Sequence, residues 1–257
     1  MTEIIRKTLY NWTEIIDFYP TSHQYKRVTI EDWKEKKENL ISVTAITWVV
    51  DKSWPLMFRA TNLARDYLLQ LPKEEITPEE IIKACMQHKT FKEQAASIGK
   101  QAHERAEMYI KAESLSLPED PKVASAVWAF LDRVEHSGIK FIESEFFVYS
   151  KLHWYIWTGD ATGTIWDKKY LIDFKTSNAI RDLEYWMQTA WYLRAKEEET
   201  GEKYDWIIIV RFSKDEDWFE TKFIEDQKEI DYLYEAFLAA KKLKIAVKKY
   251  DTWGKTE

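Results

Sequence analysis

Apolar side chains recur every three or four residues in several stretches of the chain, a spacing that places them on one face of an α-helix. This pattern predicts helices from Pro55, from Thr77 through Cys85, over 92–112, from Asp120 to Ser137, over 181–200 and from about Asp226. Thr77 and Asp120 each precede a proline, so each is expected to cap a helix that begins at that proline. Ser42 is expected to cap a shorter helix that follows it.

The stretch from about residue 139 to 224 carries shorter patterns that predict strands. In FIESEFFVYS, residues 141–150, alternation places Glu143 and Glu145 on one face and Phe146 on the other. The apolar run YDWIIIVRF, residues 204–212, is typical of a strand buried on both faces. A turn at 214–217 then leads into WFETKFI, whose alternation is that of an edge strand.

Together the two patterns predict a single α/β domain, in which a mixed central sheet at 139–224 is flanked by the helices at 92–112 and 181–200. Residues 1–90 are expected to form a mainly helical part packed on a core at 91–257. Within that part, residues 1–41 are expected to be a short hairpin or an irregular arm. With 257 residues, 45% of them hydrophobic, the chain can bury a sizeable core.

Composition narrows the function. The single cysteine, Cys85, excludes a disulfide or a cysteine-based metal site within one chain. No apolar stretch approaches a membrane span and the first residues lack a signal-peptide pattern, so no membrane partner and a cytoplasmic location are expected. The net charge of -6 argues against passive coating of duplex DNA, so a basic surface would be local. The 13 tryptophans either pack in the core or stack on unpaired bases.

The candidate chemistry lies in GDATGTIWDKKYLIDFKTS, residues 159–177. Alternation puts Asp173 and Lys175 on one face of a strand, and Asp160 lies upstream on what is expected to be the neighbouring strand. Carboxylates are typical ligands of Mg²⁺ and Mn²⁺, and a lysine beside such a metal can orient or deprotonate the water that attacks a phosphodiester. The alternative is a surface Asp–Lys pair on an edge strand.

Several short motifs follow one another along the chain. They comprise Gly99, His103 and Glu107, then Asp160, then Asp173 with Lys175, and finally Gln188 with Tyr192. In this order they resemble the RecB-type exonuclease branch of the PD-(D/E)XK nuclease superfamily. Upstream, three short segments resemble the lead-in of phage-encoded members, so the resemblance spans about residues 20–212; they are His23 to Tyr25, Ser42 to Thr44, and Asp51 with Lys52.

The resemblance implies a restriction-endonuclease-like fold and a site for Mg²⁺ or Mn²⁺. The implied metal ligands are His103, Asp160, Asp173 and the carbonyl of Phe174. Lys175 would position the attacking water, and Gln188 and Tyr192 would orient the phosphate. Some relatives, among them the CRISPR adaptation nucleases, carry four cysteines for an iron–sulfur cluster. This chain lacks them, so no such cluster is expected.

Several residues keep two interpretations. His103 is either a ligand or a structural histidine beside an apolar stripe, and Glu107 either holds its imidazole or is a solvated neighbour one turn away. Glu145 precedes an apolar run as a glutamate does in the resembling family, and it either supports the metal and its water or is an exposed strand carboxylate. The lysines near the C-terminus either contact DNA or form a solvated helix end; they are Lys241, Lys242, Lys244 and Lys248.

The resemblance implies a metal-dependent deoxyribonuclease, and the first choice is an exonuclease acting on single-stranded DNA or DNA ends in recombination, repair or replication. DNA is the expected partner, with a second copy of the chain or a recombination protein as further partners, in the host cytoplasm if the protein is phage-encoded. A structure-specific endonuclease and a non-catalytic DNA-binding subunit are the alternatives. The clustered carboxylates Asp160 and Asp173 speak against the last, because an idle fold does not need such like charges.

Overall fold

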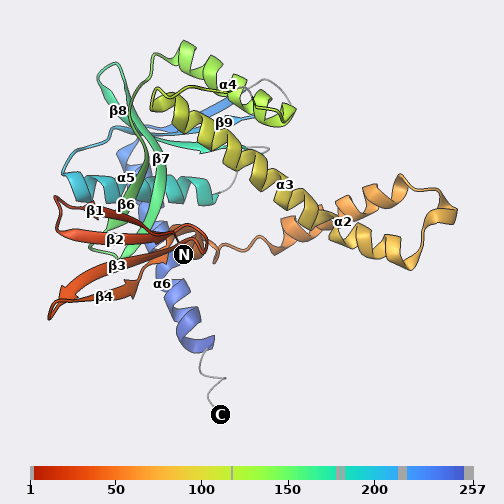
Figure 1. Ribbon diagram of the computed structural model, residues 1–257, viewed down its shortest axis with the longest axis horizontal. Helices are drawn as coiled ribbons and strands as arrows, with labels where there is room; N and C mark the ends of the chain where they lie inside the picture. The colour runs from red at the N-terminus through yellow and green to blue at the C-terminus, as the bar shows by residue number, and fades with distance from the viewer. Residues whose placement is uncertain (1–2, 117, 178–179, 181–182, 214–218, 252–257) are drawn as a thin grey trace.

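The computed structural model describes residues 3–116, 118–177, 180, 183–213 and 219–251, which form two sheets and the helices around them (Figure 1). The larger, six-stranded sheet contains β5 (Ile41–Ser42), β6 (Lys140–Ser150), β7 (Tyr155–Ile165), β8 (Lys168–Lys175), β9 (Trp206–Phe212) and β10 (Phe219–Ile224). Its order is β10-β9-β8-β7-β5, and β6 also pairs with β7. The β8–β9 and β5–β7 pairs are parallel and the others antiparallel, which confirms a mixed sheet. The turn predicted at 214–217 lies outside the described residues.

Helices cover both faces of this sheet (Figure 1). They are α1 (Val43–Thr47), α2 (Ser53–Leu69), α3 (Pro78–Ile110), α4 (Pro121–Ser137), α5 (Leu183–Thr200) and α6 (Gln227–Asp251), with a 3-10 turn at Lys73–Glu75. Leu171 packs with α1, α5 and α6, whereas its neighbour Ile172 packs with α3 and α4. The predicted α/β architecture is therefore confirmed. Among the described residues, no helix is both long and apolar enough to cross a bilayer.

The predicted helix starts depend on local hydrogen bonds. Thr77 accepts a hydrogen bond from the Glu80 N–H at 3.3 Å, and Asp120 accepts one from the Lys122 N–H at 2.8 Å, which confirms both caps. The two helices expected on either side of residues 86–91 are instead one continuous helix, α3. That segment contains neither glycine nor proline, so nothing in it interrupts the backbone hydrogen bonds.

A second, antiparallel sheet precedes α1. Its strands are β1 (Ile5–Leu9), β2 (Glu14–Tyr19), β3 (Gln24–Glu31) and β4 (Lys34–Asn39), in that order. This corrects the hairpin or irregular arm expected at 1–41, and the helical character expected for 1–90 begins only at Val43. The sheet could not be predicted from the hydrophobic pattern, because β4 has the sequence KEKKEN and its charged side chains give no apolar alternation.

Ion pairs across the strands stabilise this charged sheet. The buried carboxylate of Asp17 accepts hydrogen bonds from Arg6 Nε at 2.6 Å and from Lys37 Nζ at 2.7 Å. The Arg6 guanidinium, followed by Lys37, holds the pKa of Asp17 below its ordinary value despite burial. On the face of the small sheet opposite Asp17, Tyr25 packs with Phe147 of β6, so the small sheet packs against the central sheet.

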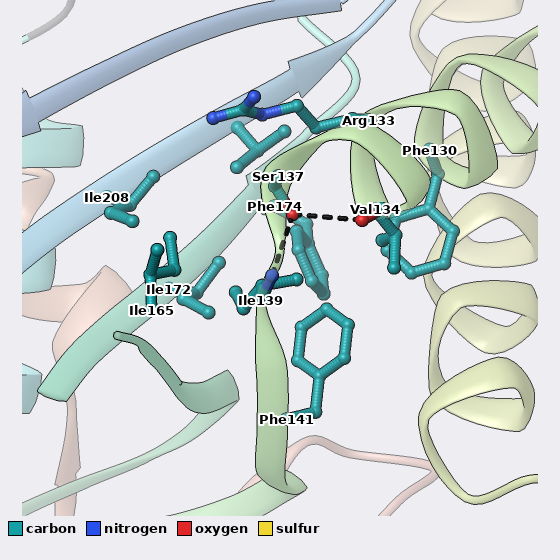
Figure 2. A pocket seen from close by; sticks show the side chains of 11 residues that line it. Phe130, Arg133, Val134, Ser137, Ile139, Phe141, Ile165, Ile172, Phe174 and Ile208 are labelled. Atoms are coloured by element: carbon teal, nitrogen blue, oxygen red, sulfur yellow. Dashed lines mark hydrogen bonds between the residues drawn. The ribbon is translucent and has the colours of Figure 1, made fainter. Parts of the chain in front are cut away.

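The core between α4 and the central sheet is aromatic. The ring of Phe130 lies 5.6 Å from that of Phe174 and 5.3 Å from that of Phe212, centroid to centroid. Phe130 and Phe174 also line an apolar pocket of about 20 Å³. Figure 2 shows the hydroxyl of Ser137, another lining residue, which donates a hydrogen bond to the Val134 carbonyl and accepts one from the Ile139 N–H. This pocket is too small for a substrate, and it lies on the face of β8 opposite Asp173.

The β3–β4 turn carries a testable strain. Asp32 and Trp33 have φ values of 49° and 62°, and the Trp33 side chain is 99% exposed. Such turns favour Asp-Gly, because glycine reaches positive φ without strain. We expect Trp33→Gly to raise the free energy of unfolding by about 1 kcal/mol, or the thermal midpoint by about 2–4 °C. Trp33→Ala, which keeps the Cβ, should change the midpoint little, and a lower midpoint for Trp33→Gly would contradict the strain.

Candidate metal centre

Three carboxylates lie in one row across the central sheet. The ladder pairs Ser144–Ala161 and Phe146–Gly159 flank Glu145 and Asp160, and the last β7–β8 pair, Ala161–Ile172, adjoins Asp160 and Asp173. The three carboxylates therefore lie at neighbouring positions on three adjacent strands. The Oδ2 atom of Asp160 accepts a hydrogen bond from the Phe174 N–H at 2.6 Å, which fixes the carboxylate against β8. The pairing of the two strands predicted to carry Asp160 and Asp173 is thus present in the structure.

His103 joins this row from α3. Its Nδ1 atom lies 3.6 Å from Oδ1 of Asp160. One ligand atom each of His103, Glu145 and Asp160 can be chosen so that all lie within 4.8 Å of one another. Gly99, one turn earlier, makes this approach possible, because a Cβ there would lie 2.9 Å from Oγ1 of Thr176 at the end of β8.

Glu145 reaches the row through an unusual backbone conformation. Its φ is 48°, in the left-handed region that non-glycine residues rarely occupy inside a strand. Alternation predicted Glu143 and Phe146 on opposite faces, but both contact Lys196 of α5. The Nζ atom of Lys196 lies 2.8 Å from Oε1 of Glu143 and 4.7 Å from the centroid of the Phe146 ring. The positive φ of Glu145 accompanies this loss of alternation in β6, which periodicity alone does not reveal.

Lys175 and Asp173 form an ion pair on the predicted common face of β8. Both side chains are largely buried, and Lys175 Nζ lies 5.1 Å from the centroid of the Tyr185 ring. Sequence reasoning missed Tyr185. It stands three residues before Gln188 and seven before Tyr192, the helical spacing that puts all three on one side of α5, so the same pattern contained the signal.

Gln188 and Tyr192 face inward rather than forming ordinary helix surface. The Gln188 amide donates a hydrogen bond to the Tyr192 hydroxyl, and the Tyr192 side chain is 1% exposed. Burial, followed by the charge of Asp173, raises the pKa of Tyr192 well above its ordinary value. The hydroxyl therefore remains protonated and can donate a hydrogen bond toward the row.

The electrostatics of the row indicate a shortage of positive charge. Burial, then the negative charge of Asp160, raises the pKa of Glu145 to about 7, and the same two causes raise the pKa of Asp173 to about 6 against the opposing effect of Lys175. Burial also acts on Asp160, but His103 and Lys175 lower its pKa overall. The negative charge of Asp160 raises the pKa of His103 although burial opposes it. A bound cation would relieve these conflicts.

Other predicted residues lie elsewhere or act differently. Glu107 forms an ion pair with Lys111 one turn on, and no hydrogen bond to His103 is present. Phe174 packs its side chain in the core, so only its carbonyl is available to a ligand. Lys241 Nζ donates a hydrogen bond to the carbonyl of His153 in the β6–β7 turn, away from the carboxylate row. The lysines Lys242, Lys244 and Lys248 lie on the same helix, α6.

No protein-family model matches this chain, and no curated protein matches its sequence. Among solved structures, it is similar to an alkaline exonuclease from Laribacter hongkongensis, at 14% identity and a TM-score of 0.37, over 83% of this chain and 93% of that one. It is also similar to the protein SSO0001, at 15% identity and a TM-score of 0.30, over 79% of this chain and 77% of that one. At these TM-scores neither likeness bears on function.

The donor set fits a divalent cation. Two ligands on opposite sides of Mg²⁺ or Mn²⁺ lie about 4.2 Å apart, so ligand atoms within 4.8 Å of one another need only small side-chain movements. Carboxylate oxygens suit both ions, and the imidazole of His103 favours the softer Mn²⁺. Asp173, across from Asp160, can supply a further oxygen.

Gly99 provides a test of this geometry. We expect Gly99→Ala to push α3 away from Thr176 and to weaken Mn²⁺ binding by about 10-fold, because His103 moves with the helix. Adding Thr176→Ala removes the clashing Oγ1 and should restore the affinity. Titration calorimetry with Mn²⁺ measures both variants, and an unchanged affinity in Gly99→Ala would show that the close approach does not position His103.

The pKa shifts predict how metal and pH act together on stability. Because the folded pKa values of Glu145 and Asp173 lie above those of the unfolded chain, their contribution to stability is full at low pH and is lost as pH rises to about 7. We expect the thermal midpoint of the metal-free protein to fall between about pH 5.5 and about pH 8, and Mn²⁺ to raise it by several degrees at the higher pH only.

Glu145→Gln removes one of these titrating groups and should flatten the pH dependence. Differential scanning calorimetry with and without EDTA measures the effect. A midpoint that rises between these two pH values without metal, or a metal effect of equal size at both, would contradict the predicted charge conflict.

Proposed function

We propose that this chain is a metal-dependent nuclease of the PD-(D/E)XK type that hydrolyses phosphodiester bonds of DNA. One observation carries the proposal: Glu145, Asp160 and Asp173 form a row, with His103 at one carboxylate and Lys175 paired with another. Few other common reactions use a metal-binding group of this kind with a buried lysine beside it.

His103, Glu145, Asp160, Asp173 and the Phe174 carbonyl would hold Mg²⁺ or Mn²⁺. When bound, such an ion polarises a phosphoryl oxygen and lowers the pKa of a bound water. Glu145 thus moves from the supporting role expected from the sequence to that of a proposed ligand.

The remaining side chains orient the reacting groups. The pKa of Lys175 is raised, because Asp173 and Asp160 outweigh the opposite effect of burial, so the resting side chain is an ammonium group. It can donate hydrogen bonds to the attacking water or to a phosphate oxygen, rather than remove a proton. Gln188 and Tyr192, which bond to each other at the same side of α5, can position the phosphate.

Within this class we propose an exonuclease that acts on single strands or DNA ends. Labelled linear and circular DNA of the same sequence, each single-stranded and duplex, should be incubated with Mn²⁺ and the purified protein. An exonuclease degrades only the linear molecules, whereas cutting of the circles would assign a structure-specific endonuclease. DNA binding without any cleavage would instead favour a non-catalytic subunit.

A further inference from the structure

The first half of α3 and all of α2 form a helical arm that projects from the body (Figure 1). None of the 17 residues of α2 is buried. The two helices contact each other through Arg59 of α2, whose Cζ atom lies 4.4 Å from the centroid of the Phe91 ring on α3. Trp54 and Phe58, one turn apart on α2, are 71% and 63% exposed. Large aromatic side chains exposed together mark a binding surface.

The base of the helical arm adjoins the metal centre. Lys52, just before α2, forms an ion pair with Glu184 at the start of α5. The next residue, Tyr185, has its ring 5.1 Å from Nζ of Lys175. The α3 helix itself runs from the arm into the site and carries His103 there. Trp54, two residues after Lys52, therefore lies at the end of the arm nearest the site.

The balance of exposed basic and acidic residues differs between the two ends of the helical arm. Near the base, exposed basic residues outnumber acidic ones by one: Arg59, Lys89, Lys92 and Lys100, against Asp51, Glu93 and Glu104, the last paired with Lys100 at 3.7 Å. Around the far end, the exposed acidic residues are Asp66, Glu74, Glu75 and Glu79, with Arg65, Lys73 and Lys83 as basic ones. In a chain with a net charge of -6, the base of the arm thus carries a small local excess of positive charge beside the metal centre.

We propose that the base of the helical arm binds a single DNA strand and leads it to the metal centre. Two unpaired bases stack on Trp54 and Phe58, and the phosphates contact Arg59, Lys92 and Lys100. Stacking selects a single strand, because the base faces of a duplex are already covered. This inference rests on the proposed function and adds the form of DNA that the site receives.

The test is fluorescence anisotropy with a labelled oligothymidylate of about 20 nucleotides, measured in EDTA so that no cleavage occurs. We expect Trp54→Ala with Phe58→Ala to weaken single-strand binding by about 10-fold or more, with little change for a duplex of equal length. Trp33→Ala, which removes a still more exposed tryptophan on the small sheet, is the control and should bind as the unmodified chain does.

Each outcome decides the proposal. Unchanged single-strand affinity in the double variant would overturn it. Unchanged affinity with a loss of self-association, measured by light scattering, would also overturn it and assign the aromatic surface to a second copy of the chain. Because binding in EDTA needs no hydrolysis, failure of the unmodified chain to cleave DNA would refute the proposed function but leave this binding result standing.

Discussion

Lys175→Met is expected to lower kcat/KM for DNA cleavage by a factor of about 10²–10⁴. Methionine keeps much of the volume of lysine but offers no charge and no hydrogen-bond donor to the water or the phosphate. Lys175 is the cation paired with Asp173 in the row, and its ammonium group is the proposed donor. The measurement is the rate of release of labelled nucleotides from linear DNA in Mn²⁺.

Lys196→Met is the matched control for this variant. Lys196 is also a buried lysine paired with a carboxylate, Glu143 at 2.8 Å, but it stands outside the proposed site. Breaking the Lys175 pair leaves the buried carboxylate of Asp173 without its partner and costs about 3–5 kcal/mol of stability. Breaking the Lys196 pair costs less, because the side chain of Glu143 is 34% exposed and is partly solvated. We therefore expect both variants to be destabilised, but only Lys175→Met to lose activity per folded molecule. Equal activity losses would mean that Lys175 acts on stability alone.

Asp160→Asn is expected to weaken Mn²⁺ binding by about 100-fold or more and to abolish cleavage. Asp160 stands at the centre of the row, between Glu145 and Asp173, and approaches His103. Asparagine keeps an oxygen for the Phe174 N–H and nearly the same shape, so the fold is preserved while one negative charge is lost. Titration calorimetry measures the affinity. The midpoint without metal should fall, because His103 and Lys175, which hold the pKa of Asp160 below its ordinary value, lose their anionic partner.

Asp205→Asn provides the control for this second variant. Asp205 also accepts a hydrogen bond from a strand N–H, that of Lys169 at 2.9 Å, but it lies before β9, outside the carboxylate row. Its replacement should leave Mn²⁺ affinity unchanged. If Asp160→Asn binds Mn²⁺ as tightly as the unmodified chain, the metal centre is not where we place it.

Much of the architecture follows from local chemistry that the sequence exposes. Thr77 and Asp120 cap their helices as expected because a side-chain oxygen followed by proline has few alternatives to a helix start. The common face of Asp173 and Lys175 follows from strand alternation alone, and their ion pair is present. The order of the motifs also led to His103, although it lies 57 residues before Asp160 in the chain.

Other features depend on contacts between distant segments. The N-terminal sheet is held by pairs such as Arg6 with Asp17, which leave no apolar period in the sequence. The positive φ of Glu145 lies in a strand whose sequence predicts a regular alternation of faces. The need for glycine at position 99 becomes visible only when α3 meets Thr176. Each of these requires the assembled fold.

The most direct test of the central claim is cleavage of labelled linear single-stranded DNA by the purified chain, in Mn²⁺ and in EDTA, beside Asp173→Ala. We predict degradation in Mn²⁺ that is abolished both by EDTA and by the substitution, because Asp173 carries the ion pair with Lys175 and completes the carboxylate row. Degradation by Asp173→Ala at the unmodified rate, or equal degradation in EDTA, would contradict a metal-dependent nuclease at this site.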